Sequence, residues 1–342
     1  MFKTETVFSS NLIYDVNNIK ISGKINNDLD KEKLIENAFQ KAFIIFVNKI
    51  LLKKDAISLY KTKIGIIKDL IFTYQIIKNE GNYKKENSLI VNIHFDQKKI
   101  NNFLAQKGIS YADISNISLT MLPILIKKKD VLLYTDNFFY NNWTKTENTT
   151  EIINNNLIKY NLALENIEDL EYINRNKENL ELMNIKKILS FHEEKNHVLL
   201  IIYFTEDKFR AYVKTLIENK EIDKNIDLKI YPENEIKSYE EAILTLKEEI
   251  SQIWKEQNLI DVNTPSFLDF FLETKQINDY LKLRSILDSL DIIENYFVLE
   301  MTNEHVKIRL KYKGKVSKIR DKLSGQKISI QITDNIWRLK IN

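Results

Sequence analysis

The stretch "HVKIRLKYK", residues 305–313, alternates apolar and basic side chains over its whole length. Successive side chains of a β-strand point to opposite faces, so the alternation predicts a strand with one apolar face and one basic face. The apolar face would carry Val306, Ile308, Leu310 and Tyr312, and the basic face Lys307, Arg309, Lys311 and Lys313. Such a strand belongs to a sheet that covers a core on one side only.

The elements around this strand predict the architecture of the C-terminal region. In chain order they are the strand "SFLDFFLE", the helix "KQINDYLKLRSILDSL", the strand "IIENYFVLEMT", the strand at 305–313, the helix "VSKIRDKLSG" and the strands of "KISIQITDNIWRLKI". This β-α-β-β-α-β order predicts a ferredoxin-like unit over residues 263–342, with a four-stranded antiparallel sheet in the spatial order 4-1-3-2. We expect the helices at 275–290 and 315–324 on its apolar face. The first helix would present Ile277, Tyr280, Leu281, Leu287 and Leu290 to the sheet.

The opposite, open face of this sheet is a candidate interaction face. It would carry Phe267, Phe271, Lys307, Arg309 and Lys311. Aromatic rings beside cations on an open sheet are how RNA-recognition modules stack bases. However, the glycine–aromatic signature of those modules is missing, and the third strand has lysines where the stacking rings belong. We therefore favour a solvated face, or one covered by the middle domain or a partner protein.

The chain has 342 residues, too many for one ordinary core, and predicts a multi-domain α+β protein. We expect an N-terminal α+β domain at 1–143. It would hold an extended segment at 11–25, a long helix, strands at 71–78 and 88–95, and a helix at 96–107 that ends at a left-handed Gly108. The strands "NISLTMLPILIK" and "DVLLYT" would complete it.

A polar stretch, "TKTENTTEIINNN" at 144–156, is the predicted linker to a middle α/β domain at 157–262. That domain would contain a helix around 178–192, the strand "HVLLIIYF" and a long amphipathic helix. Ser238 and Glu241 match a capping box at the start of the long helix.

Composition narrows the function classes. The net charge of +3 demands no polyanionic partner, and the absence of cysteine excludes disulfides and thiolate metal sites. The longest apolar run, "AFIIFVNKILL", falls short of the roughly 18 residues of a membrane span. The start, "MFKTETVFSS", lacks the pattern of a secretory signal. Either the protein is cytoplasmic, or its numbering begins after a signal.

Catalytic signatures are missing from the sequence. "HEEKNH" at 192–197 differs from the zinc-protease motif because its two histidines are five apart, about 140° from each other on a helix, and a strand is expected to begin at His197. The six glycines never fall in phosphate-loop register, and no Gly-x-Ser-x-Gly elbow occurs. We therefore expect no enzymatic activity, no catalytic or metal-binding residue and no cofactor.

The segment "NFFYNNW", residues 137–143, admits two interpretations. Asn137, Phe138, Tyr140 and Trp143 have the aromatic walls and amide groups of a pocket for a sugar or another small polar ligand. Alternatively, Phe138, Phe139 and Trp143 lie on one side of a short helix capped by Asn137 and plug a core. Large aromatic residues beneath a strand edge are usually core residues, so the plug is favoured.

Four stretches together resemble a known family. They are the entry "V-x-x-I-x-I-x-G" at 16–23, "HFDQKKINNFLAQKGISYADIS", the strand carrying "LPILI" and "LLYTDNFFYNNW". Over residues 10–145, and more loosely in the C-terminal region, the chain resembles proteobacterial envelope proteins that are defined only as a domain of unknown function. The resemblance implies a periplasmic location. Together with the missing catalytic motifs and the ferredoxin-like C-terminal unit, it leads us to expect a non-enzymatic binding or assembly role, with protein as the partner. The alternative is a cytoplasmic RNA-binding protein that uses the open face of the C-terminal sheet.

Overall fold

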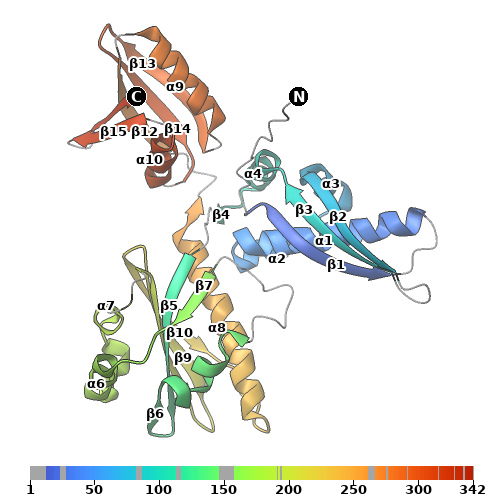
Figure 1. The fold of residues 1–342 in the computed structure, drawn as a ribbon, viewed down its shortest axis with the longest axis vertical. Helices are drawn as coiled ribbons and strands as arrows, with labels where there is room; N and C mark the ends of the chain where they lie inside the picture. The colour runs from blue at the N-terminus through green and yellow to red at the C-terminus, as the bar shows by residue number, and fades with distance from the viewer. Residues whose placement is uncertain are drawn as a thin grey trace, which may run out of the picture. The chain divides into compact units, whose positions relative to one another are not determined.

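The computed structural model shows a mixed α+β protein in two units (Figure 1). It describes residues 13–23, 28–81, 87–112, 117–145, 158–190, 192, 195–260, 266–274, 276–290, 292–314, 316–326, 328–333 and 336–341. One unit contains Met1–Asp113 and Asn258–Asn342, and the other is Ile114–Gln257. None of the helices in the described ranges combines the length and apolarity needed to cross a bilayer.

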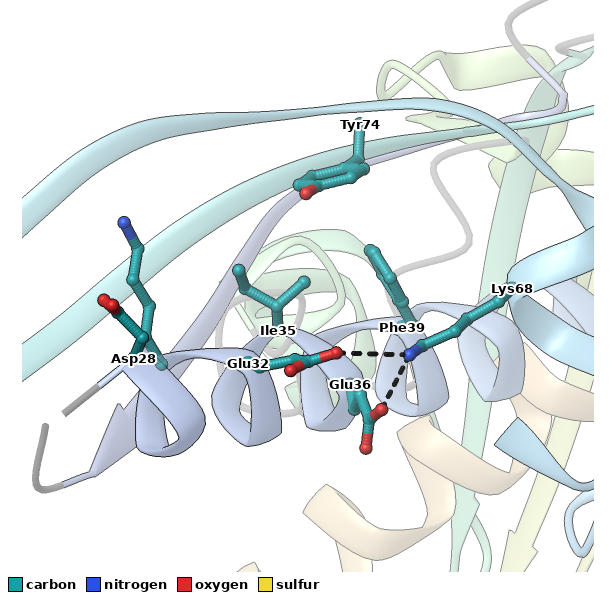
Figure 2. A pocket seen from close by; sticks show the side chains of 8 residues that line it. Asp28, Glu32, Ile35, Glu36, Phe39, Lys68 and Tyr74 are labelled. Atoms are coloured by element: carbon teal, nitrogen blue, oxygen red, sulfur yellow. Dashed lines mark ion pairs between the residues drawn. The ribbon is translucent and has the colours of Figure 1, made fainter. Parts of the chain in front are cut away.

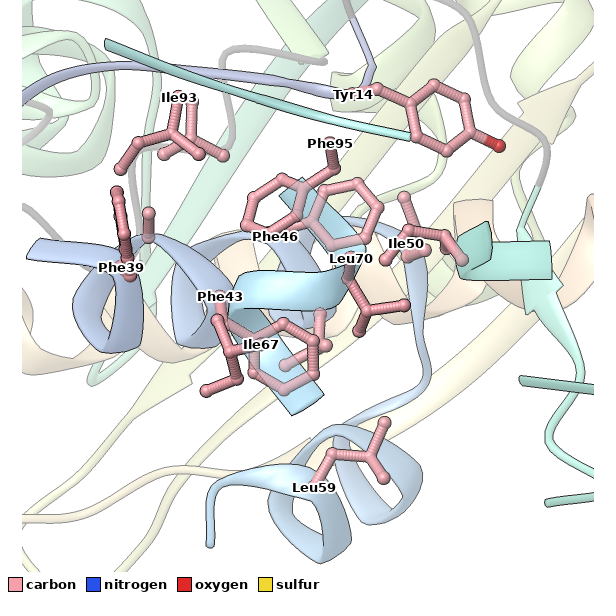
Figure 3. Close-up of a cluster of buried hydrophobic side chains, with 14 of the residues drawn as sticks. Tyr14, Phe39, Phe43, Phe46, Ile50, Leu59, Ile67, Leu70, Ile93 and Phe95 are labelled. Atoms are coloured by element: carbon pink, nitrogen blue, oxygen red, sulfur yellow. The ribbon is translucent and has the colours of Figure 1, made fainter. Parts of the chain in front are cut away.

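The N-terminal part of the first unit is a three-stranded antiparallel sheet with helices on one face. Strands β1 (Asp15–Gly23), β3 (Asn87–Phe95) and β2 (Ile71–Gly81) lie in that order. Helix α1 (Asp28–Ile50) packs its apolar stripe on the sheet, because its buried residues recur at helical spacing. Figure 3 shows Phe43, Phe46 and Phe95 in this core, where the rings of Phe46 and Phe95 stack with centroids 4.7 Å apart.

Three shorter helices complete this part. They are α2 (Lys53–Leu59), α3 (Ile64–Leu70) and α4 (Gln97–Gln106). The predicted strands and the helix at 96–107 are confirmed, whereas α2 and α3 were not predicted. Gly108 follows α4 with a φ of 65°, the left-handed conformation expected of it.

The C-terminal part is compatible with a ferredoxin-like unit but has five strands. Their order is β13 (Ile293–Met301), β14 (His305–Tyr312), β12 (Ser266–Glu273), β16 (Ile336–Ile341), β15 (Ile328–Thr333). The predicted neighbours of the strand at 305–313 are confirmed, with β14 antiparallel to both β12 and β13. The expected fully antiparallel four-stranded order is wrong at the other edge. The last segment forms a hairpin whose second strand, β16, lies parallel to β12 and leaves β15 outermost.

Helices α9 (Ile277–Ser289) and α10 (Val316–Ser324) both contribute to the core of this sheet. Leu283 and Leu287 of α9 are buried there, with Ile319 and Leu323 of α10. The expected lining of α9 was partly wrong, because Ile277 and Leu281 are 59% and 50% exposed. The buried stripe runs through Leu283 and Leu287, while Leu281 lies about 200° from Leu283 around the helix.

The second unit is a six-stranded sheet between helical layers. Its order is β10 (Lys220–Asp227), β9 (Phe209–Ile217), β8 (His197–Phe204), β5 (Ile117–Lys127), β6 (Asp130–Leu132), and β7 (Ile158–Leu162) also pairs with β5. Strand β5 is parallel to β8 and β7, and most residues of β5 and β8 are buried. Figure 1 shows α8 (Glu235–Gln257) on one face, and α6 (Ile167–Arg175) and α7 (Ile185–Ile188) on the other.

The division of the chain differs from the predicted domains at 1–143, 157–262 and 263–342. Strand β5 and the segment after it were placed in the N-terminal domain, but β5 pairs with β8 inside the second unit. The N-terminal and C-terminal parts share the first unit, where β4 (Tyr111–Ala112) pairs with β11 (Leu259–Ile260). Beyond Lys145, the predicted linker at 144–156 lies outside the described residues.

Two local predictions in the second unit were wrong. The helix expected around 178–192 is broken into a 3₁₀ turn, η3 (Lys177–Leu182), and the short α7. Helix α8 begins one turn before the expected capping box, because the Oδ1 atom of Asn234 accepts the backbone N–H of Lys237 at 2.9 Å. The hydroxyl of Ser238 instead accepts the backbone N–H of Tyr231 at 2.8 Å.

Candidate functional site

The segment 137–143 forms the short helix α5 (Phe138–Asn142), and Asn137 holds it in place. The buried Oδ1 of Asn137 accepts the backbone N–H of Phe139 at 2.9 Å. Its Nδ2 donates to the carbonyl of Pro123 at 2.9 Å and to that of Leu132 at 3.2 Å. Asn137 therefore caps α5 and ties it to β5. Both polar atoms of its side-chain amide bond to the protein's own backbone.

The aromatic rings of this segment pack into the second unit. Phe139 and Trp143 are fully buried, and Trp143 meets Tyr160 edge-on at 5.4 Å. Both Phe138 and Phe139 contact Tyr239 of α8, with ring centroids 5.1 and 5.3 Å away.

Two further contacts fix the segment in this position. The ammonium of Lys247 donates to the backbone carbonyl of Trp143 at 2.7 Å, and the Tyr140 hydroxyl donates to Ala163 O at 3.0 Å. These contacts are those of a core element. Of the three rings predicted to form the plug, Phe139 and Trp143 are fully buried, whereas Phe138 is only partly buried.

The open face of the C-terminal sheet brings together the five residues that the sequence placed on it. In the ladder between β12 and β14, Phe267 lies opposite Lys311, and Phe271 lies opposite Lys307. Between these pairs, Arg309 donates two hydrogen bonds to the carboxylate of Asp269, at 2.7 and 2.8 Å. These hydrogen bonds from Arg309 hold the pKa of Asp269 below its usual range, so the carboxylate stays charged.

Two further cations of this face are also paired with acids. Lys311 lies 3.2 Å from Glu294, and Arg338 of β16 lies 3.4 Å from Glu273. The ring of Phe271 lies near two cations, with Lys307 and Arg338 at 5.5 and 5.7 Å from its centroid. The predicted basic face is therefore a mosaic of cations, carboxylates and rings.

Two phenylalanines on this face stay in contact with solvent. Phe267 is 58% exposed, and Phe297 of β13, which lies opposite Arg309, is 46% exposed. Sequence reasoning missed Phe297, although its strand was predicted, because the register that puts it beside Arg309 depends on a bulge in β13. We call Phe267, Phe271, Phe297, Lys307, Arg309 and Lys311 the open face.

A hollow of about 300 Å³ between α1, α3 and β2 was not expected from the sequence (Figure 2). Phe39 and Tyr74 form an aromatic wall, with ring centroids 5.0 Å apart. On the other side, the Lys68 ammonium lies 2.7 Å from Glu36 and 3.8 Å from Glu32. The hydrogen bond that the Lys68 ammonium donates to Glu36 holds the pKa of Lys68 above its usual value. The protein thus supplies its own cation to these carboxylates, and the contact joins α3 to α1.

The histidines of "HEEKNH" do not face each other as metal ligands would. His197 begins β8, as predicted, and its side chain is buried. The Nε2 atom of His192 lies 3.9 Å from the carboxylate of Asp169, a buried group at the start of α6. Within the described residues, no three His, Cys, Asp or Glu side chains are grouped to hold a metal ion.

Comparisons with models of protein families, with curated proteins and with solved structures find no match for this chain.

Proposed function

We propose that this chain is a non-enzymatic binding or assembly protein that docks a protein partner on the open face. The observation that carries the proposal is the exposure of Phe267 and Phe297 beside the ion pair of Arg309 and Asp269. Aromatic residues and arginine are the residue types that dominate binding energy at protein interfaces. A partner that covers both rings would remove their apolar surface from water. This burial would favour binding by about 25 cal/mol of free energy for each Å² of apolar surface covered.

The ion pairing favours a protein over RNA as the partner. Nucleic-acid affinity comes mainly from cations that neutralise phosphates. Here Arg309, Lys311 and Arg338 each have a carboxylate within 3.4 Å. An incoming phosphate would have to compete with these carboxylates, and their negative charge would repel it.

Site-specific photocrosslinking tests this proposal. A photoreactive phenylalanine analogue at position 267 or 297 should give a discrete protein adduct in cells. The same analogue at Leu281 is the matched control, since that side chain is half exposed on α9, which packs on the other face of the sheet. Adducts of equal yield from all three positions, or from none, would contradict the proposal.

RNA binding is tested on the same face. Tight, salt-sensitive binding of single-stranded RNA that is abolished by Lys307→Glu and Arg309→Glu would establish the alternative instead. We expect the unmodified protein to show no such binding.

We also propose that the protein works in the bacterial envelope, as the family resemblance implies. Expressing the gene from its native start and separating periplasmic from cytoplasmic fractions tests the location. Recovery in the cytoplasmic fraction alone would contradict it.

A further inference from the structure

The outer face of the N-terminal sheet, opposite α1, carries a second hollow of about 410 Å³. Its lining consists of Asp15, Asn17, Thr73, Tyr74, Gln75, Asn92, Ile93 and His94. Its volume is within the range of small-ligand pockets, roughly 300–1,000 Å³. The register brings these side chains together, since Asp15 and Thr73 lie opposite His94 on either side, and Gln75 lies opposite Asn92.

The polar groups of this hollow are held in fixed orientations. The Nδ1 atom of His94 lies 2.5 Å from the Asp15 carboxylate, which can accept a hydrogen bond from Nδ1 and leaves Nε2 as a second polar atom. A bulge in β1 places Asn18 at a φ of 60°, and its backbone N–H donates to the Oδ1 atom of Asn92 at 2.8 Å. The amide of Asn92 is thereby oriented, with its nitrogen as the remaining donor.

An exposed aromatic ring stands beside these groups. Phe72 is 70% exposed, and its ring meets that of His94 edge-on at 5.8 Å. Burying this ring would remove a large apolar surface from water, yet the core of the domain does not use it. A ring placed next to oriented amides offers a flat apolar surface to a ligand that also needs hydrogen bonds.

The chemistry of the lining selects the class of ligand. None of the eight lining residues is Lys or Arg, which disfavours phosphates and nucleotides. Seven of the eight carry polar side-chain groups, which disfavours lipids. Amides, a carboxylate and a hydroxyl can each bind hydroxyl groups, and the faces of pyranose rings are apolar enough to lie against an aromatic ring.

We propose that this hollow binds an uncharged saccharide, with one sugar ring against Phe72 and its hydroxyls bound by Gln75, Asn92 and the Asp15–His94 pair. This site is separate from the open face, and the proposal does not depend on a protein partner.

Saturation-transfer difference NMR on the full chain tests the site with three probes: maltose, cellobiose and N,N′-diacetylchitobiose. We expect saturation of the ring protons of at least one of them. Phe72→Ala and Gln75→Ala should each weaken that binding by about five- to tenfold. Both side chains are exposed, so the melting temperature should stay within about 2 °C of the parent protein.

Matched controls make the test specific. Ile77→Ala removes an exposed apolar side chain from the same strand, and Lys20→Ala removes an exposed polar one from β1, both outside the lining. Neither should change the affinity. The proposal is overturned if no probe shows saturation transfer, or if Phe72→Ala and Gln75→Ala bind as tightly as these controls.

Discussion

Trp143 is the residue on which the two interpretations of "NFFYNNW" differ most. It is fully buried, it contacts Tyr160, and its backbone carbonyl binds Lys247. Trp143→Ala should lower the free energy of unfolding by about 3–5 kcal/mol, because it empties a large buried site. Urea denaturation measures this cost, with Phe267→Ala as the exposed aromatic control that should change stability by less than about 1 kcal/mol. A Trp143→Ala protein as stable as the parent would show that the ring does not serve the core.

The buried side chain of Lys255 should make the free energy of unfolding depend on pH in alkaline solution. Burial lowers the pKa of Lys255 to about 8, although Glu248 opposes this shift. In the unfolded chain the same group has a pKa near 10.5, so between these pH values the unfolded chain binds more protons. The free energy of unfolding should therefore rise between about pH 8 and pH 10.5, by at most about 3 kcal/mol for this group.

Lys255→Met tests that assignment. The variant should be more stable than the parent at pH 7, and its advantage should shrink as the pH rises through the same window. Lys49, whose pKa burial also lowers to about 8, should keep part of the pH dependence in the variant. Melting temperatures measured from pH 7 to pH 10.5 would refute the assignment if the two proteins changed in parallel.

At the scale of single elements, helix α9 shows where a sequence pattern succeeds and where it fails. The apolar spacing predicted the helix and its contact with the sheet, both of which the structure confirms. It did not fix the rotation of the helix, because Ile277, Leu281, Leu283 and Leu287 offer overlapping apolar stripes. Packing against both β12 and β14 selects the stripe that contains Leu283 and Leu287.

The rotation of α9 can be tested by comparing alanine substitutions at two of its leucines. Leu283 is fully buried and Leu281 is 50% exposed. Leu283→Ala should cost about 2–5 kcal/mol, whereas Leu281→Ala should change the free energy of unfolding by about 0.5 kcal/mol or less. Equal costs for the two substitutions would mean that the helix is rotated relative to the structure described above.

The strands show a second limit of prediction from sequence: it does not identify which distant strands pair. Alternation in residues 305–313 predicted which side chains face the core, because that information is local. The strand at 117–127 was also predicted, but its parallel partner lies about 80 residues further along the chain. An apolar run carries no information about which distant strand it pairs with. Strand β5 was therefore assigned to the N-terminal domain, although it belongs to the second unit. The Asp15–His94 pair was missed for the same reason, although the polar residues Asn92 and His94 on one face of a strand were a visible signal.

At the scale of the whole molecule, the pairing of β5 predicts how the chain can be divided. Every ladder of the six-stranded sheet lies within residues 114–257, and so do the helices that cover it. A fragment 114–257 should therefore fold alone, with a single cooperative melting transition and dispersed amide resonances. A fragment 144–262, which spans the predicted linker and middle domain, lacks β5 and leaves one edge of β8 unpaired. It should aggregate or remain without fixed tertiary packing. Cooperative folding of 144–262, or its failure in 114–257, would show that β5 is not the central strand of this unit.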